Sequence, residues 1–185
     1  MKIKKFFYVF ALLLTLSLFV GDVGWAQPKT EKMPPIITNS FAIEKGYYGL
    51  IWKIYIEADD PDGNMYKIAS VVDQVGYGHY ATDWIILKAK YRNHIKGYIQ
   101  WNTFSSKASY LKEWTQITLK VSIFDKAGNE SNVVVFPFTF QSGVKDEYKY
   151  TLPSPFDQGD LPRLGHIMID LTQPDYGDPS GARTP

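Results

Sequence analysis

Short runs in which apolar and polar residues alternate are the feature that most constrains the fold of this chain. The clearest run extends from Ile51 to Ala58, where Trp52, Ile54, Ile56 and Ala58 alternate with Lys53, Tyr55 and Glu57. A period of two is typical of a β-strand with one face on a core and the other in water, because successive side chains of a strand point to opposite faces. The alternation therefore predicts an all-β domain.

Seven such runs, separated by turn residues, are predicted within residues 34–141. They are Ile36–Phe41, Ile51–Ala58, Tyr66–Val75, Tyr80–Leu87, Ile95–Thr103, Ile117–Ile123 and Val133–Phe140. The regular alternation of Ile117–Ile123 predicts a central strand, whereas Pro137 lacks an N–H donor and favours an edge or a bulge for the last strand. Seven short strands without an amphipathic helix predict an immunoglobulin-like antiparallel β-sandwich.

Two loops carry a resemblance to a known family. DKAGNES, at residues 125–131, resembles the hairpin before the last strand in bacterial immunoglobulin-like domains. ADDPDGN, at residues 58–64, is similar to the loop after the second strand in those domains and in cadherin-like relatives. The resemblance implies a single bacterial immunoglobulin-like or fibronectin-III-like β-sandwich over residues 34–141. The chain departs from the family pattern in having no cysteine pair across the sheets.

The first 26 residues are typical of a secretory signal peptide. Three lysines precede an apolar run of 15 residues from Phe6 to Val20, and Gly24 and Ala26 suit a cleavage site. An uncleaved anchor is the alternative, but 15 helical residues span only about 22 Å of a roughly 30 Å hydrocarbon core. We expect export to the periplasm or the extracellular space, a polar lead at residues 27–33, and no transmembrane segment in the mature chain.

Residues 142–185 hold six of the eleven prolines. This composition predicts an extended, largely disordered, Pro/Gly-rich C-terminal tail. Within the tail, Leu161 to Leu171 keeps an apolar group around Ile167 and Ile169. Two interpretations stay open for it, namely an extra strand or flap packed on the sandwich, and a peptide that binds a partner.

Composition excludes several classes of function. The absence of cysteine excludes a disulfide framework, a thiolate metal site and a cysteine nucleophile. The formal net charge of +1 gives no electrostatic basis for binding nucleic acid. His79, His94 and His166 lie far apart without zinc-ligand spacing, and no nucleophile elbow or phosphate loop is present. We therefore expect a non-catalytic protein.

An oxygen-rich cluster predicts a calcium site. In an immunoglobulin-like sandwich the loop after the second strand and the loop before the last strand lie at the same end. The oxygen ligands that calcium requires would come from Asp60, Asp62, Asn64, Asp125 and Asn129. The alternative is that Asp and Asn cap the two turns, with Gly63 and Gly128 supplying positive φ.

Aromatic residues suggest a second candidate surface. Trp52 and Trp101 fall on inward phases and are expected in the core, whereas Tyr55, Tyr66 and Tyr98 fall on outward phases. Exposed rings suit sugar stacking or protein binding, and cross-strand pairing is the alternative. The sequence thus favours a secreted, non-catalytic binding or structural module of the cell envelope, with calcium rigidifying one loop end. The alternative function is a carbohydrate-binding sandwich, and the partner is an unknown protein or polysaccharide.

Overall fold

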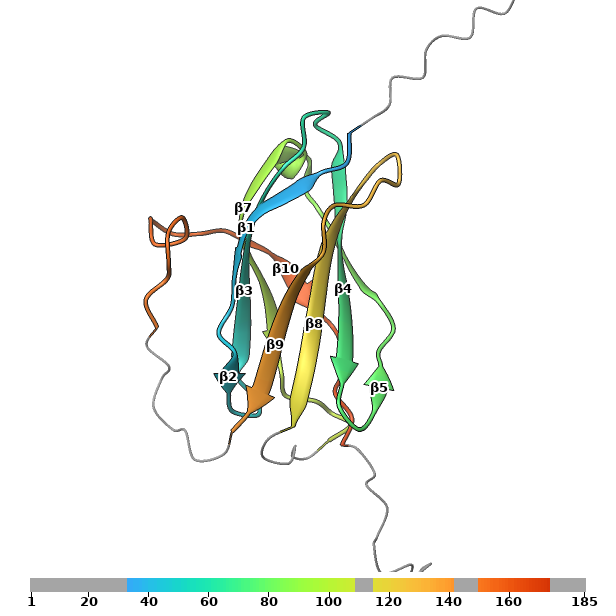
Figure 1. The fold of residues 1–185 in the computed structure, drawn as a ribbon, viewed down its shortest axis with the longest axis vertical. Helices are drawn as coiled ribbons and strands as arrows, with labels where there is room; N and C mark the ends of the chain where they lie inside the picture. The colour runs from blue at the N-terminus through green and yellow to red at the C-terminus, as the bar shows by residue number, and fades with distance from the viewer. Residues whose placement is uncertain (1–32, 109–114, 142–149, 174–185) are drawn as a thin grey trace, which may run out of the picture. The chain divides into compact units, whose positions relative to one another are not determined.

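Two β-sheets packed face to face account for the fold (Figure 1). The computed structural model describes residues 33–108, 115–141 and 150–173. One sheet has four strands in the order β1 (Ile36–Phe41), β3 (Ile51–Asp59), β7 (His94–Asn102) and β10 (Arg163–Ile167). The predicted signal peptide and nearly all of the polar lead lie outside the described residues.

The second sheet has six strands. Its order is β2 (Lys45–Gly46), β9 (Val134–Phe140), β8 (Gln116–Asp125), β4 (Met65–Gln74) and β5 (Gly78–His79), and β6 (Asp83–Ile86) also pairs with β4. A short 3₁₀ helix, η1 (Ala89–Tyr91), precedes β7. Most neighbouring strands are antiparallel, while β2 with β9 and β10 with β7 are parallel. The prediction of an all-β, immunoglobulin-like sandwich is confirmed, but the sheets are mixed and not wholly antiparallel, and the described residues form ten strands in place of about seven.

The core forms where the predicted alternation turns side chains inward. On β3 and β7, Trp52 lies opposite Trp101 in the register, and both side chains are buried. The Trp52 ring lies 4.6 Å from that of Phe138 on the facing sheet, and its Nε1–H donates to the carbonyl of Ile43 at 2.9 Å. The expected core role of both tryptophans is confirmed, and each indole N–H has a partner, as burial requires.

Strand order confirms two predictions about position and corrects one about a boundary. The β8 strand lies between β9 and β4, and β9 is an edge strand at Pro137, because β2 pairs only with Thr139 and Phe140. The predicted strand Tyr80–Leu87 is wrong in its first half, since β6 begins at Asp83. Residues 80–82 are not part of a strand, although the Tyr80 N–H still donates to the carbonyl of Val72 on β4 at 2.9 Å.

The C-terminal segment is part of the sandwich. Residues 150–173 are described, and β10 pairs with β7 as an additional strand. Its apolar side chains Phe156, Leu164, Ile167, Ile169 and Leu171 are buried. The expectation of a largely disordered tail is therefore wrong for these residues, because prolines permit an extended chain that still packs. The extra-strand interpretation of Leu161–Leu171 is confirmed, and residues 142–149 and 174–185 lie outside the described part.

The segment that follows β10, residues 168–173, closes one side of the sandwich. We call the contact between this segment and the two sheets the seam. Trp101 Nε1–H donates to the carbonyl of Ile169 at 2.9 Å, and the Ser105 hydroxyl donates to that of Leu171 at 2.6 Å. On the other sheet, Gln74 Nε2 donates to the carbonyl of Thr172 at 2.7 Å. One segment is thus hydrogen-bonded to residues from both sheets. Within the described residues, no helix is long and apolar enough to cross a membrane.

Candidate functional site

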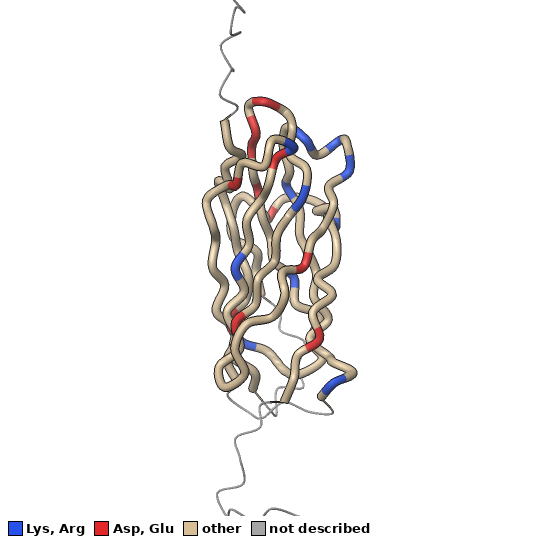
Figure 2. Tube along the Cα trace, turned by 90° about the vertical axis from the view of Figure 1, so that its right-hand side faces the viewer, with Lys and Arg blue, Asp and Glu red and all other residues tan. Residues whose placement is uncertain are grey.

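The loops after β3 and β8 meet at one end of the sandwich, where Figure 2 shows charged residues of both signs. The Lys126 N–H donates to the carbonyl of Asn64 at 3.1 Å and joins the two loops. The Asp60 N–H donates to the carbonyl of Asn93 at 2.8 Å and ties the first loop to the start of β7. The prediction that the two loops share an end is confirmed.

The carboxylates at this end cap turns. Asp60 accepts the N–H groups of Asp62 and Asn64 at 2.9 and 3.0 Å, and Asp125 accepts that of Asn129 at 2.8 Å. Asp62 accepts the Met33 N–H at 2.7 Å. Gly63 and Gly128 have φ of 65° and 91°, as such turns need. These bonds match the capping alternative, and no group of three or more Asp, Glu, His or Cys among the described residues is placed to hold a metal ion.

Asn64 is the unexplained residue of this loop end. Its side chain is only 8% exposed, and neither Oδ1 nor Nδ2 has a hydrogen-bond partner among the residues that the structure describes. A buried amide without partners is costly, by about 1–3 kcal/mol. The predicted calcium site of Asp60, Asp62, Asn64, Asp125 and Asn129 therefore stays a prediction. The buried amide of Asn64 is the structural observation that favours it.

The three tyrosines do not form one exposed row. Tyr55 and Tyr98 are cross-strand partners with ring centroids 5.7 Å apart, whereas Tyr66 lies on β4 in the other sheet. Tyr55 is only 5% exposed, because Phe156 packs on it at 5.8 Å. Burial raises the pKa of Tyr55 above its ordinary value of 10.0. The C-terminal segment thus covers the ring that was expected to be free, and cross-strand pairing describes Tyr55 and Tyr98.

The opposite outer surface has no such cover among the described residues. We call it the open face and define it by Lys67, Trp84, Ile86, Phe124 and Val135. Ile86, Lys67 and Phe124 form one cross-strand row of this face, and Trp84 lies in the next row beside the buried Ala69 and Ser122. Val135 is the partner of Lys120 on β8 and is 54% exposed. Trp84 and Ile86 are 44% and 56% exposed. Lys67 Nζ lies 3.7 Å from the centre of the Trp84 ring, and the Phe124 ring meets that of Trp84 edge to face.

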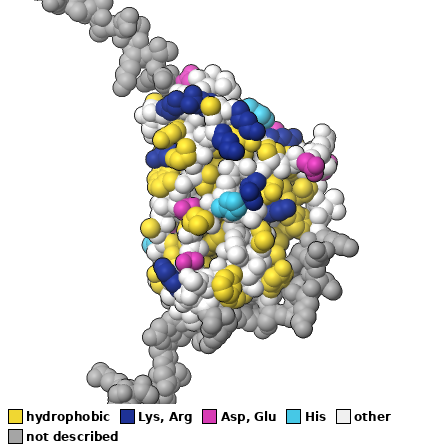
Figure 3. Space-filling model, turned by 180° about the vertical axis from the view of Figure 1, so that it is seen from behind, with side chains coloured by type: hydrophobic (Ala, Val, Ile, Leu, Met, Phe, Trp, Pro, Cys, Tyr) yellow, Lys and Arg dark blue, Asp and Glu magenta, His cyan; other side chains and the backbone are white. Residues whose placement is uncertain are grey.

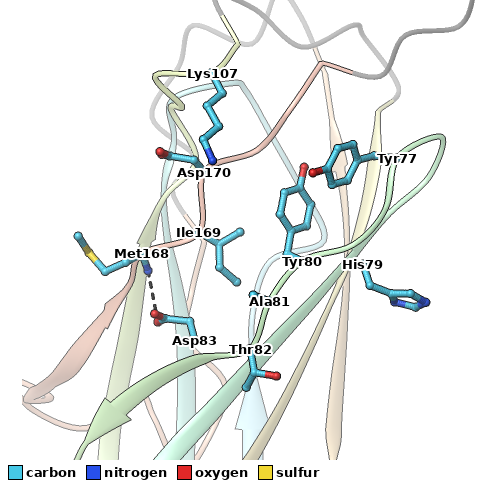
Figure 4. Close-up of a pocket in the computed structure, with 10 residues that line it drawn as sticks. All are labelled: Tyr77, His79, Tyr80, Ala81, Thr82, Asp83, Lys107, Met168, Ile169 and Asp170. Atoms are coloured by element: carbon cyan, nitrogen blue, oxygen red, sulfur yellow. Dashed lines mark hydrogen bonds between the residues drawn. The ribbon is translucent and has the colours of Figure 1, made fainter.

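A pocket of about 370 Å³ lies at the seam. We call it the seam pocket. Tyr77, Tyr80, Thr82 and Asp83 form one wall, and Met168, Ile169 and Asp170, with Lys107 at the rim, form the other. Figure 4 shows Tyr80 standing between Tyr77 and the Ile169–Asp170 side, while the His79 imidazole points away. Such a volume is at the lower end of the range for small-molecule sites, about 300–1,000 Å³.

Hydrogen bonds fix both walls of the seam pocket. The Tyr80 hydroxyl donates to Gln74 Oε1 at 2.5 Å and accepts the Thr172 N–H at 2.8 Å. Its ring stacks on that of Tyr77 with centroids 4.7 Å apart. Burial raises the pKa of Tyr80. Across the pocket, the Met168 N–H donates to Asp83 Oδ2 at 3.3 Å. The pocket is therefore preformed.

The three histidines lie in different surroundings. His79 contacts Asp73, which also pairs with Lys120 at 2.7 Å. His94 lies 2.8 Å from Asp59, and His166 lies on β10.

Seen from behind, the molecule carries apolar side chains among basic and acidic ones, with Lys and Arg mainly in the upper half (Figure 3). That face has no single sign of charge.

Sequence reasoning missed the open face and the seam pocket. Trp84 and Ile86 do alternate with Ile85, so the phase of β6 was the available signal for the open face. The seam pocket had no local signal, because its two walls come from residues 77–83 and 168–170. Only the apolar group around Ile169 indicated that this part of the chain would pack.

No protein-family model matches the chain, and no curated protein matches it in sequence. Among solved structures it is similar to the PKD domain of an M14-like peptidase from Thermoplasmatales archaeon SCGC AB-540-F20. The identity is 17% and the TM-score 0.38, over 60% of this chain and 99% of that one. The assignment of the fold rests on the sheet order and register given above.

Proposed function

We propose that the chain is an exported, non-catalytic immunoglobulin-like module of the cell envelope that binds a protein partner through its open face. The observation that carries this proposal is the unequal covering of the two sheets. Phe156 covers Tyr55 on the four-stranded sheet, while Trp84 and Ile86 on the six-stranded sheet are left exposed. Contiguous exposed apolar side chains on a monomer are typical of an interaction surface.

The open face has the composition of a protein interface. Aromatic side chains are enriched at such interfaces, and Trp84 and Phe124 lie here beside the aliphatic Ile86. Lys67 Nζ lies 3.7 Å from the centre of the Trp84 ring and 5.6 Å from that of Phe124, so the rings are held in place before any partner binds. A partner surface with apolar groups around one carboxylate would match Lys67 and its neighbours.

The alternative function, carbohydrate binding through Tyr55, Tyr66 and Tyr98, has less support. It needs rings that a sugar can reach, and Tyr55 is covered by the C-terminal segment. Tyr98 has Lys53 Nζ at 4.9 Å from its ring centre, and Tyr66 belongs to the other sheet. The three rings therefore offer no common platform.

Photo-crosslinking in cells that export the chain tests the open face. A photoreactive phenylalanine analogue is placed at residue 86, and the same analogue at residue 104 is the control, because Phe104 is 56% exposed outside the open face. We expect one discrete protein adduct from position 86 only. Trp84→Ala should reduce that adduct severalfold, because buried tryptophans dominate interface energies. Equal adducts from both positions, or none from position 86, would contradict the proposal.

The export part of the proposal rests on residues 1–26. This segment has the features of a signal peptide, namely three lysines, an apolar run and small residues before Gln27. Amino-terminal sequencing of the protein recovered from cells should begin at Gln27. Recovery of a chain that still begins at Met1, in a cytoplasmic fraction, would contradict export.

We also propose that calcium rigidifies the loop end. Asn64 supports this, because its buried Oδ1 has no hydrogen-bond partner within the described part of the chain, and a cation would supply one. Asp60 and Asp125 belong to the two loops that the Lys126–Asn64 bond joins, and their carboxylates keep lone pairs beyond the N–H groups they accept. Calcium would add oxygen ligation to turns that are already formed.

Thermal unfolding of the mature chain, with chelator and then with about 10 mM calcium, tests this part. Extracellular modules bind calcium at roughly 10⁻⁴ to 10⁻³ M, so mass action predicts about 1.4 to 2.7 kcal/mol of added stability. The melting temperature should rise by several degrees. The rise should be absent with magnesium and in Asn64→Ala. An unchanged melting temperature in calcium would refute the calcium site and leave the binding proposal intact.

A further inference from the structure

We propose that the seam pocket binds one neutral sugar residue of a glycan. This site goes beyond the proposed function, because none of its lining residues belongs to the open face. Its aromatic wall, its rim of acceptors and one donor, and its fixed shape together carry the inference.

The aromatic wall offers one face of Tyr80. The hydroxyl of Tyr80 is fully engaged by Gln74 and Thr172, and one face of its ring stacks on Tyr77. Figure 4 shows the ring between Tyr77 and the Ile169 side of the pocket. A pyranose has one face of C–H groups, and these partly positive groups pack favourably on the negative face of an aromatic ring.

The rim offers the hydrogen-bonding groups that sugar hydroxyls need. Among the described residues, Asp83 Oδ2 accepts the Met168 N–H at 3.3 Å, and Asp170 Oδ2 accepts the Ser106 hydroxyl at 3.2 Å. Each carboxylate therefore retains lone pairs for a ligand. Lys107 extends toward Asp170 in Figure 4, and its ammonium group supplies donors. Acceptors beside a donor suit adjacent hydroxyls, each of which donates and accepts.

The charged groups of the rim favour a neutral ligand over an acidic one. The pocket is lined by two carboxylates, those of Asp83 and Asp170, and by one ammonium group, that of Lys107. An acidic sugar would be repelled by the two carboxylates, whereas the ammonium group of an amino sugar could not accept a hydrogen bond from Lys107, as a neutral hydroxyl can. The hydrogen bonds that fix both walls also mean that little ordering is needed when a ligand binds, which favours affinity.

Saturation-transfer NMR on the full mature chain tests the proposal. The neutral probes are maltotriose, cellotriose and mannotriose, with a uronic acid trisaccharide and a glucosamine trisaccharide as charged probes. We expect at least one neutral probe to receive saturation, chiefly on the C–H groups of one ring face. Lys107→Met and Asp170→Ala should each weaken its binding about tenfold, because each removes a charged hydrogen-bonding group. Asp157→Ala, outside the pocket, is the matched control and should bind as the wild type does.

Several results would overturn the proposal. No saturation of any neutral probe would do so, as would a preference for either charged probe. Binding that is undiminished in both rim variants would place the sugar elsewhere and exclude the seam pocket. Because Lys107 and Asp170 lie outside the open face, these results are independent of the crosslinking at residue 86.

Discussion

At the scale of single residues, two glycines let the C-terminal segment approach the sandwich. A methyl group added at Gly97 would overlap the carbonyl oxygen of Pro162, and one added at Gly165 would overlap Ile85 Cγ2. The approach at Gly97 also lets the Tyr98 N–H donate to Pro162 at 3.0 Å. Since interiors are packed without spare space, any larger residue must displace a neighbour. Glycine is required here for close approach.

Gly165→Ala should therefore lower the free energy of unfolding by about 1–3 kcal/mol, the usual cost of overpacking. Urea unfolding of the mature chain measures it. Ile85→Ala alone should cost about 2–5 kcal/mol, because it leaves a cavity. In the double variant the new methyl group occupies that cavity, so the combined cost should be less than the sum of the two. Strictly additive costs would show that Gly165 and Ile85 do not compete for space.

Asp73 makes stability depend on pH. The hydrogen bond from Lys120 holds the pKa of Asp73 below its ordinary value of 3.8, and His79 acts in the same direction. Because the folded-state pKa is depressed, the ionised carboxylate stabilises the fold above the unfolded value. This contribution is lost as pH falls through the folded-state pKa.

Asp73→Asn should accordingly lower the free energy of unfolding at neutral pH by less than about 1 kcal/mol, as for other exposed ion pairs. The difference from the wild type should vanish in acid, below the folded-state pKa. Urea unfolding across the pH range measures this, and Lys120→Met should remove most of the same dependence. A difference that persists unchanged into acid would mean that Asp73 acts through packing.

Side-chain phase was predictable from the sequence, but burial was predictable only in part. Alternation correctly placed Trp52 and Trp101 inward and Tyr55 outward. It gave no sign that Phe156 would cover Tyr55, because that contact depends on a segment far along the chain. Similarly, turn chemistry predicted that Asp60 and Asp125 could cap their loops, which the structure shows.

At the scale of elements, β10 is the main addition to what the sequence predicted. Its residues do not alternate, since Leu164 and Ile167 are buried and Gly165 lies between them. Its position comes from pairing with β7, to which it is parallel. In an immunoglobulin-like sandwich of constant type, the edge strand in the position of β10 comes from the middle of the chain. Here a strand from the C-terminal segment takes that place.

A chain that ends at Gln141 should fail to fold. It lacks the five buried apolar side chains of residues 150–173, and burial of each is worth about 1.5–3 kcal/mol. Their sum is comparable with the whole stability of a domain, about 5–15 kcal/mol. Circular dichroism and proton NMR dispersion measure the loss, with a chain ending at Gln173 for comparison. Cooperative unfolding of the shorter chain near the wild-type melting temperature would show that the segment is only an accessory.

At the scale of the whole molecule, both candidate sites depend on the way the sheets are closed. The open face is the surface of the six-stranded sheet over which no described segment runs, and the seam pocket lies between residues 77–83 and 168–170. Contacts between such distant parts of the chain are set by the tertiary fold and have no local sequence signal. This is why the sequence predicted the sandwich, and the loops at its end, but neither of these sites.

If the C-terminal segment is integral to the fold, it should unfold together with the core. The indole N–H of Trp101 donates to Ile169 in that segment, and the indole N–H of Trp52 donates to Ile43 elsewhere in the sandwich. Native-state hydrogen exchange of these two groups should give opening free energies that agree within about 1 kcal/mol, both near the global value. A much smaller value for Trp101 would mean that the segment opens on its own. The seam pocket would then open and close with it, and sugar binding would be coupled to that local opening.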